Sequence, residues 1–217
     1  MNAVRFTLVT DGSSDAALKH PLRWLLINNG VARPIEGVWA DLRPLPAATK
    51  FLADKIDAAF EYYPCELMFI HRDAEREPAT FRREEIEHAV RKVFGNQTDQ
   101  RPYVAVVPVR MTEAWFLFDE HHLREAAGNP KGMVPLDLPP LPKIEGLVNP
   151  KETLNQLFRT ATELPAQRLK RFSCAQAFHR LAELIQDFAP LRQLPAFNYL
   201  EEDLRGVVEN AGWRKPA

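Results

Sequence analysis

The sequence predicts an α/β fold with a mostly parallel central sheet and a helical extension at its C-terminal end. Three apolar runs carry this prediction, each ended by polar or turn residues: VRFTLV (4–9), CELMFI (65–70) and YVAVVPV (103–109). A short continuous run such as CELMFI is typical of a strand that is buried on both faces of a parallel sheet. Helical patterns separate the runs, and such long connections favour parallel pairing through right-handed crossovers.

Three amphipathic helices are expected between these strands. The first follows the Asp11-Gly12-Ser13 turn and extends to Asn29-Gly30, and Pro21 disturbs its start. The second lies in ATKFLADKIDAAFEYY (48–63), and the third lies in FRREEIEHAVRKVFGN (81–96). The inward face of the second helix is formed by Phe51, Leu52, Ile56, Ala59, Phe60 and Tyr63. The predicted order is therefore strand, helix, helix, strand, helix, strand.

The rest of the chain is predicted to be helical. MTEAWFLFDEHHLREAAG (111–128) predicts one helix, or two short helices with Asp119 as the N-cap of the second. The proline-rich stretch that follows is longer than typical loops, so it is either a functional loop or a boundary. Further helices are expected at 150–162, at 173–189 with Ser173 as N-cap, and at 196–210. We therefore divide the chain into an α/β core (1–127), a loop or linker (128–149) and a helical extension packed on the core (150–217).

Composition indicates a folded globular protein and excludes several classes. The 217 residues carry a formal net charge of −1, so a nucleic-acid partner would bind a local patch and not a basic domain. Cys65 and Cys174 lie far apart in apolar contexts, which argues against a disulfide framework and favours a reducing compartment. The N-terminus leads directly into strand-like sequence, and no window reaches membrane-spanning length. We expect a cytoplasmic protein without a membrane partner.

Acidic residues follow all three predicted strands: Asp11 and Asp15, then Asp73 and Glu75, then Glu113. The carboxyl ends of parallel strands share one edge of the sheet, and ligands bind at that edge. Converging carboxylates repel one another unless a cation compensates, and hard oxygen ligands suit Mg²⁺ or Mn²⁺. The sequence therefore predicts a Mg²⁺ or Mn²⁺ site.

Local roles compete with a site for the same residues. Asp11-Gly12 also fits a turn, Asp15 also fits the positive end of a helix dipole, and Asp73 also fits a cap. His71 adjoins the acids and is expected to be structural or to contact a phosphate. The adjacent pair His121-His122 points in directions about 100° apart on a helix, so the two rings are not expected to share one ion.

The stretches LVTDGSSD, FIHRDAE and VPVRMTEAWFLFD each place an acid just past a predicted strand. Together they resemble the motifs of Toprim domains, in particular those of an OLD-like nuclease subgroup often described as the domain of unknown function DUF4276. The resemblance covers about residues 4–120, with looser agreement in NPKETL and LPAFNYLEEDL. It implies a Toprim-like fold of three layers.

The resemblance also implies a function, because Toprim domains hold one or two Mg²⁺ ions for phosphoryl transfer. Asp11 matches the first-motif acid, where Glu is usual, and Asp73 with Glu75 matches the usual Asp-x-Asp pair. Glu113 matches the extra acid of the subgroup. The implied protein is a Mg²⁺-dependent nuclease with DNA as the favoured substrate and an ATPase partner in bacterial defence. The predicted catalytic residues are Asp11, Asp73, Glu113 and Lys151, and the predicted metal ligands are Asp11, Asp15, Asp73, Glu75 and Glu113.

Two other functions stay open. The same fold can serve a non-catalytic, metal- or nucleic-acid-binding regulatory subunit, which the shorter Asp11 allows. A receiver-like or nucleotide-binding domain would also gather acids around Mg²⁺, but the sequence has no phosphate-cradling glycine loop. An active site also needs a cation to balance charge in the transition state, for which Arg72, Lys143 and Lys151 are candidates.

Overall fold

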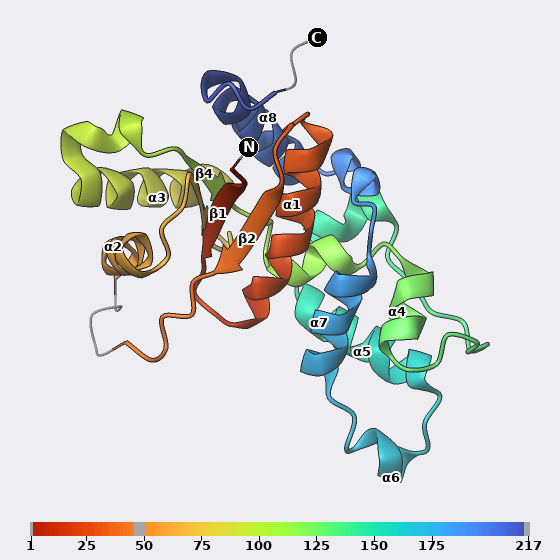
Figure 1. The fold of residues 1–217 in the computed structure, drawn as a ribbon. Helices are drawn as coiled ribbons and strands as arrows, with labels where there is room; N and C mark the ends of the chain where they lie inside the picture. Colours follow the sequence, from red (N-terminus) through yellow and green to blue (C-terminus); the bar gives the residue numbers. More distant parts are fainter. Residues whose placement is uncertain (1, 46–50, 215–217) are drawn as a thin grey trace.

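The structure, a computed structural model, describes residues 2–45 and 51–214. At its centre lies a sheet of four parallel strands in the order β2-β1-β3-β4 (Figure 1). The strands are β1 (Val4–Val9), β2 (Ile35–Trp39), β3 (Leu67–His71) and β4 (Tyr103–Val106). The predicted α/β class and parallel sheet are therefore confirmed.

Strand β2 corrects the predicted order of elements, because the segment between the first two helices contains a strand and not just a connection. β2 forms an edge of the sheet, its residues are half-buried or exposed, and Pro34 and Gly37 break any apolar run. Gly37 lies against Phe6 of β1, and a Cβ at position 37 would lie 2.2 Å from the Phe6 ring. Strands and longer helices therefore alternate from β1 to β4.

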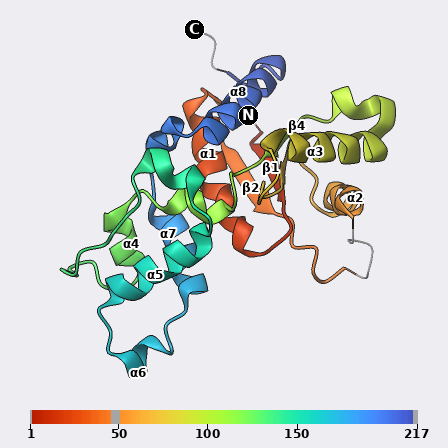
Figure 2. The ribbon, with the colours of Figure 1, turned by 180° about the vertical axis from the view of Figure 1, so that it is seen from behind.

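Helices cover both faces of the sheet (Figure 2). Helices α2 (Leu52–Tyr62) and α3 (Ala79–Phe94) pack on one face, whereas α1 (Lys19–Asn28) and the C-terminal helices lie on the other. Neighbouring strand residues face opposite layers: Phe69 belongs to the hydrophobic cluster on the α1 side, and Met68 belongs to the cluster under α2 and α3. The predicted three layers are present.

Two details differ from the predicted helices. Ser14–Leu18 forms a 3₁₀ turn, so α1 begins only at Lys19, and Pro21 lies in its first turn, where its missing N–H costs no helical hydrogen bond. Phe51 was predicted to face inward but is 68% exposed. Its backbone is extended and precedes α2, so it does not share the inward face of that helix.

The segment after β4 forms two short helices, which is one of the two predicted alternatives. A 3₁₀ helix spans Thr112–Phe116, and α4 spans Glu120–Ala126. Asp119 caps α4 as predicted, because its Oδ1 accepts a hydrogen bond from the N–H of His122 at 3.0 Å. The proline-rich stretch that follows contains a 3₁₀ helix, Leu141–Gly146, which buries Ile144.

The C-terminal helices largely follow the prediction. They are α5 (Pro150–Thr162), α6 (Ala166–Leu169), α7 (Cys174–Leu184) and α8 (Pro195–Asn210). Ser173 caps α7 as predicted, but α7 ends at Leu184 and not at residue 189, and the backbone is extended at Ile185. The short α6 was not predicted, and 3₁₀ helices also span Gly95–Gln100 and Ala189–Gln193.

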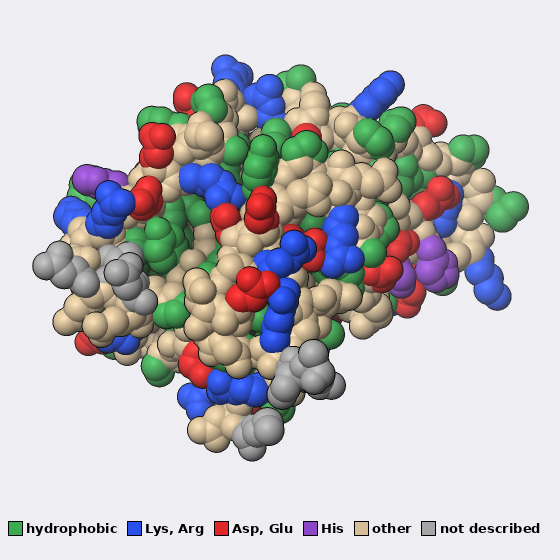
Figure 3. All heavy atoms as spheres, turned by 90° about the horizontal axis from the view of Figure 1, so that it is seen from above, with side chains coloured by type: hydrophobic (Ala, Val, Ile, Leu, Met, Phe, Trp, Pro, Cys, Tyr) green, Lys and Arg blue, Asp and Glu red, His purple; other side chains and the backbone are tan. Residues whose placement is uncertain are grey.

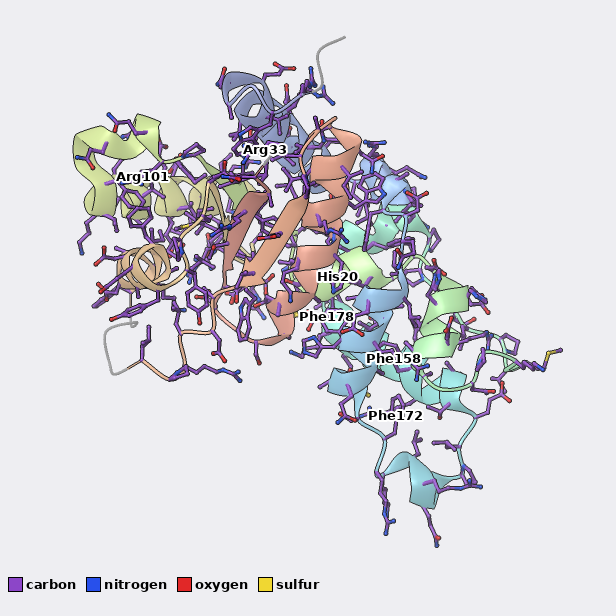
Figure 4. The ribbon with its side chains drawn as sticks, viewed as in Figure 1. His20, Arg33, Arg101, Phe158, Phe172 and Phe178 are labelled. Carbon is purple, nitrogen blue, oxygen red and sulfur yellow. The ribbon has the colours of Figure 1, made fainter. Side chains whose placement is uncertain are left out.

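One hydrophobic cluster joins the sheet to the C-terminal helices. It contains Phe6 of β1, Trp115 after β4, Phe158 of α5 and Phe197 of α8. Trp115 and Phe197 pack edge to face with centroids 5.2 Å apart. Figure 4 shows Phe158 and Phe178 among the helices on the α1 side. The cluster crosses both predicted boundaries, and the division of the chain at 127 and 149 stays a prediction.

The surface shows no concentration of one charge on the face seen from above in Figure 3, where basic and acidic side chains are interspersed. This agrees with the net charge of −1. Among residues 2–45 and 51–214, no helix combines the length and the apolar character that crossing a membrane requires.

Candidate metal centre

The carboxyl edge of the sheet brings together Asp15, His71 and Asp73. Asp15 lies in the 3₁₀ turn after β1, His71 ends β3, and Asp73 follows two residues later. One ligand atom of each residue lies within 4.8 Å of those of the other two. We call this group the Asp15–His71–Asp73 cluster.

Thr112 fastens the cluster to the segment after β4. Its backbone N–H donates to Asp73 Oδ1 at 2.9 Å, and its hydroxyl donates to Asp15 Oδ1 at 2.9 Å. His71 Nε2 lies 3.1 Å from both Thr112 Oγ1 and Asp73 Oδ1. Thr112 is completely buried. Three loops that are far apart in the sequence therefore meet at one side chain.

Burial leaves the cluster short of positive charge. Asp15 is 6% exposed, and this burial raises the pKa of its carboxyl group above the usual value, with a further increase from the charge of Asp73. His71 is 1% exposed, and although burial opposes its charged form, the hydrogen bond to Asp73 and the charge of Asp15 raise its pKa overall. The buried carboxylate of Asp15 and the half-buried carboxylate of Asp73 thus share one imidazole as their positively charged neighbour.

The donor atoms of the cluster fit a divalent cation. His71 Nδ1 is buried, has no hydrogen-bond partner among the described residues, and lies 3.8 Å from Asp15 Oδ2. An imidazole nitrogen that is free in this way and two carboxylates are ordinary ligands of Mn²⁺ and related ions, and a cation would also relieve the repulsion between Asp15 and Asp73. Mg²⁺ prefers an all-oxygen shell, so the imidazole favours Mn²⁺.

Asp11 lies at the same edge but belongs to a different group. Its Oδ1 accepts a hydrogen bond from Lys55 Nζ at 2.6 Å, and its Oδ2 accepts one from Arg72 Nη1 at 2.6 Å. Burial opposes ionisation, yet these two cations lower the pKa of Asp11 below its usual value. Both of its oxygens are therefore already paired with positive charge.

Glu75, another predicted ligand, points its side chain largely into solvent. Glu75 has a side chain that is 66% exposed and lies 3.5 Å from Arg82. Its backbone has a φ of 55° and pairs with Arg110 through the Glu75 N–H to Arg110 O bond at 3.1 Å, which holds the two loops together. Beside them lies a cavity of about 490 Å³ whose lining includes Arg76 and Met111.

Glu113 is buried beside the cluster and faces one lysine. It is 5% exposed, and Lys151 Nζ at the start of α5 lies 3.3 Å from its Oε1. Burial raises the pKa of Glu113, and the charge of Asp73 adds to the increase, whereas Lys151 opposes it. Of the other predicted cations, Arg72 contacts Asp11, and Lys143 is exposed in the 3₁₀ helix Leu141–Gly146.

Sequence reasoning did not find Thr112 or Lys55. Thr112 acts through a hydroxyl and a backbone N–H, which form no recognisable motif. Lys55 lies in the first turn of α2, which returns from the carboxyl edge of the sheet, and this position is the signal that would have pointed to it.

A second group of ligand-type residues lies on α4, away from the cluster. Ligand atoms of His121, His122 and Glu125 lie within 4.8 Å of one another, although adjacent histidines were not expected to converge. His122 Nδ1 lies 2.6 Å from Asp119 Oδ2, so this ring nitrogen already has a partner. Any measurement of metal binding has to separate this group from the Asp15–His71–Asp73 cluster.

Comparisons of the chain with protein-family models, with curated proteins and with solved structures give no match. The resemblance to Toprim domains therefore stays a prediction, and the argument for function depends on the geometry of the site.

Proposed function

We propose that this protein is a divalent-metal-dependent phosphodiesterase of the nuclease type with a Toprim-like fold, acting on nucleic acid with DNA favoured. The observation that carries the proposal is the convergence of Asp15, His71 and Asp73 from two loops at the carboxyl edge of a parallel sheet. A cytoplasmic location and an ATPase partner in bacterial defence belong to the same proposal; the location is inferred from the two separate cysteines and the N-terminal sequence, and the partner from the sequence resemblance alone.

The residues divide the work in this proposal. Asp15, His71 and Asp73 would hold the ion, and Thr112 fixes their relative positions. A bound divalent ion neutralises the phosphodiester and lowers the pKa of a coordinated water. Lys151, whose side chain is 55% exposed, would stabilise the charge that develops on a phosphate oxygen. Glu113 holds Lys151 in place.

Cleavage of a labelled DNA duplex and of the matching single strand, each with Mn²⁺ or Mg²⁺, tests the proposal. Asp73→Ala should reduce the rate of cleavage by about 100-fold or more, because even loss of a residue that only hydrogen-bonds to a metal ligand costs about 10- to 100-fold, and this substitution removes a ligand itself. Asp57→Ala, which removes an exposed carboxylate on α2, is the matched control and should cleave like the unaltered protein. Asp73→Asn keeps the shape of the side chain and removes its charge. If it loses activity as Asp73→Ala does, the loss reflects the missing carboxylate and not a loss of folding. Equal cleavage by Asp73→Ala and the unaltered protein would overturn the proposal.

One observation favours a second candidate, a metal-binding regulatory subunit without turnover. Asp11, which the family resemblance places among the catalytic acids, is held by Lys55 and Arg72. Calorimetric titration with Mn²⁺ separates the two functions: binding that Asp73→Asn abolishes, in a protein that cleaves neither strand form, would establish the regulatory subunit.

A further inference from the structure

We propose that Asp11 is a positioning residue and not a metal ligand: it holds Lys55 and Arg72 as a cation pair that binds a phosphoryl group of the substrate beside the Asp15–His71–Asp73 cluster. The inference deepens the proposed function and depends on it. It assigns Asp11 a different role from the one that the sequence resemblance implies.

The contacts of Asp11 carry the first step. Each of its two oxygens accepts a charge-assisted hydrogen bond of 2.6 Å, one from Lys55 and one from Arg72. Coordination of an ion by this carboxylate would bring the ion up against two fixed positive charges. Asp15 and Asp73 face no such cost, because their neighbours are Thr112 and one imidazole.

The cation pair is fixed from more than one side. Arg72 lies between two cluster residues in the chain, and its Nη2 forms an ion pair with Glu85 Oε1 of α3 at 3.0 Å. Glu85 is itself shared with Arg82 at 2.9 Å. Carboxylates on two sides therefore set the plane of the Arg72 guanidinium, while Lys55 approaches from the first turn of α2.

The pair keeps donors for a further anion. An ammonium group has three N–H donors, and Lys55 uses one of them for Asp11. Arg72 Nη1 carries two N–H donors and uses one of them for Asp11, and Nη2 carries two more beside Glu85. The side chain of Asp11 is 42% exposed, and those of Lys55 and Arg72 are 18% and 22% exposed, so part of each reaches solvent. A lysine and an arginine that share one carboxylate match the charge and the several acceptor oxygens of a phosphoryl group.

Metal affinity tests the role of Asp11. Mn²⁺ binding is measured by calorimetry and by the electron paramagnetic resonance signal of free Mn²⁺, in a His121→Asn/His122→Asn background that removes the ligand group on α4. Asp11→Asn should bind Mn²⁺ within about threefold of the background protein, whereas Asp15→Asn and Asp73→Asn should lose about 10-fold or more. An equal loss in Asp11→Asn and Asp15→Asn would overturn the inference. Absence of Mn²⁺ binding in the background protein would instead overturn the proposed metal centre.

Binding of a fluorescein-labelled single-stranded oligonucleotide in EDTA tests the cation pair without metal or cleavage. Lys55→Gln should weaken binding by about 3- to 10-fold and reduce the slope of log affinity against log salt by about 0.7, the value for one phosphate contact on a single strand. Lys55→Arg should restore both. Lys92→Gln, which removes an exposed lysine on α3, is the control and should match the unaltered protein. Unchanged affinity and slope in Lys55→Gln would overturn the inference.

A double-mutant cycle tests whether Asp11 acts through Lys55. The fold-change in oligonucleotide affinity that Asp11→Asn causes should become much smaller when Lys55 is already Gln. An equal fold-change in both backgrounds would show that Asp11 acts independently of the lysine and would overturn its positioning role.

Discussion

Two carboxylates that follow the same strand, Asp11 and Asp15, lie in opposite electrostatic environments. Asp11 is partly exposed and bonded to two strong cations, which lower its pKa. Asp15 is buried against a hydroxyl and an imidazole, and burial raises its pKa. The two residues are four positions apart, so the difference comes from what α2 and the loops after β3 and β4 bring to each of them. In the described part of the chain, the polar contacts of the Asp15 carboxylate are to Gly12, Thr112 and His71, whereas Asp11 contacts a lysine and an arginine.

A third carboxylate shows what a well-paired acid looks like inside this protein. Glu201 of α8 is 6% exposed and accepts hydrogen bonds from Arg192 at 2.8 and 2.6 Å and from Asn29 at 3.2 Å. The bonds from Arg192 lower the pKa of Glu201 below its usual value. Burial alone therefore does not determine the pKa of an acid in this protein. The hydrogen-bond and charge partners determine whether the pKa is raised or lowered.

The largest expected effect comes from Thr112, which is buried and holds Asp15 and Asp73 in place through two hydrogen bonds. Thr112→Val keeps the shape and the backbone N–H to Asp73 but leaves Asp15 Oδ1 without its buried donor. An unsatisfied buried group costs about 1–3 kcal/mol of unfolding free energy. Loss of the group that orients the ligands should weaken Mn²⁺ binding by about 10- to 100-fold. Denaturant unfolding and calorimetry measure the two effects.

Thr160→Val is the matched control for that substitution, because Thr160 is exposed near the end of α5. It should change the unfolding free energy by less than about 0.5 kcal/mol and leave Mn²⁺ affinity unchanged. Equal stability and equal Mn²⁺ affinity in Thr112→Val and Thr160→Val would show that the hydroxyl of Thr112 does not organise the cluster.

An intermediate effect is expected at Glu201, where the acid is well paired. Glu201→Gln retains an oxygen acceptor but loses the charge, and the difference between a charged and a neutral hydrogen bond is on the order of 1 kcal/mol of unfolding free energy. Because the folded-state pKa is lowered, this contribution is present above the usual glutamate pKa of 4.5 and is lost as the pH falls through the lower folded value. Unfolding curves of the two proteins measured from pH 7 to pH 3 should therefore converge at the acid end.

Glu202→Gln controls for loss of charge alone, because Glu202 is the exposed neighbour on α8. It should shift stability by less than about 0.5 kcal/mol at pH 7. A stability difference between Glu201→Gln and the unaltered protein that stays constant from pH 7 to pH 3 would contradict the assigned pairing with Arg192.

The sequence predicted the parts of the fold whose pattern is local. β1 and α5 have their predicted bounds, because a buried strand and a capped amphipathic helix each carry their own signal. β2 was missed because an edge strand needs no apolar run. Its Gly37 leaves room for the ring of Phe6, a contact with a residue 31 positions earlier that no local pattern reveals. The 3₁₀ turn before α1 likewise has no strong local signature.

The location of the site could be predicted from the sequence, but the contacts that each acid makes there could not. The acids after the strands do reach one edge, since parallel strands require it. The partner of each acid comes from another element of the fold. Lys55 of α2 forms an ion pair with Asp11, and the hydroxyl of Thr112 donates a hydrogen bond to Asp15. No spacing in the sequence encodes these contacts, so Asp11 and Asp15 looked alike.

The smallest effect is expected at Glu113, which is buried like Glu201 but has as its charged partner the exposed amine of Lys151, at 3.3 Å. Burial raises the pKa of Glu113, so its charge gains little from the pair and contributes little to folding. Glu113→Gln should therefore change the unfolding free energy at pH 7 by less than about 0.5 kcal/mol, in contrast to the same substitution at Glu201. Chemical denaturation of the two variants side by side measures the difference. A loss at Glu113 as large as that at Glu201 would mean that Lys151 neutralises Glu113 fully, and Glu113 would then need no additional cation from the cluster beside it.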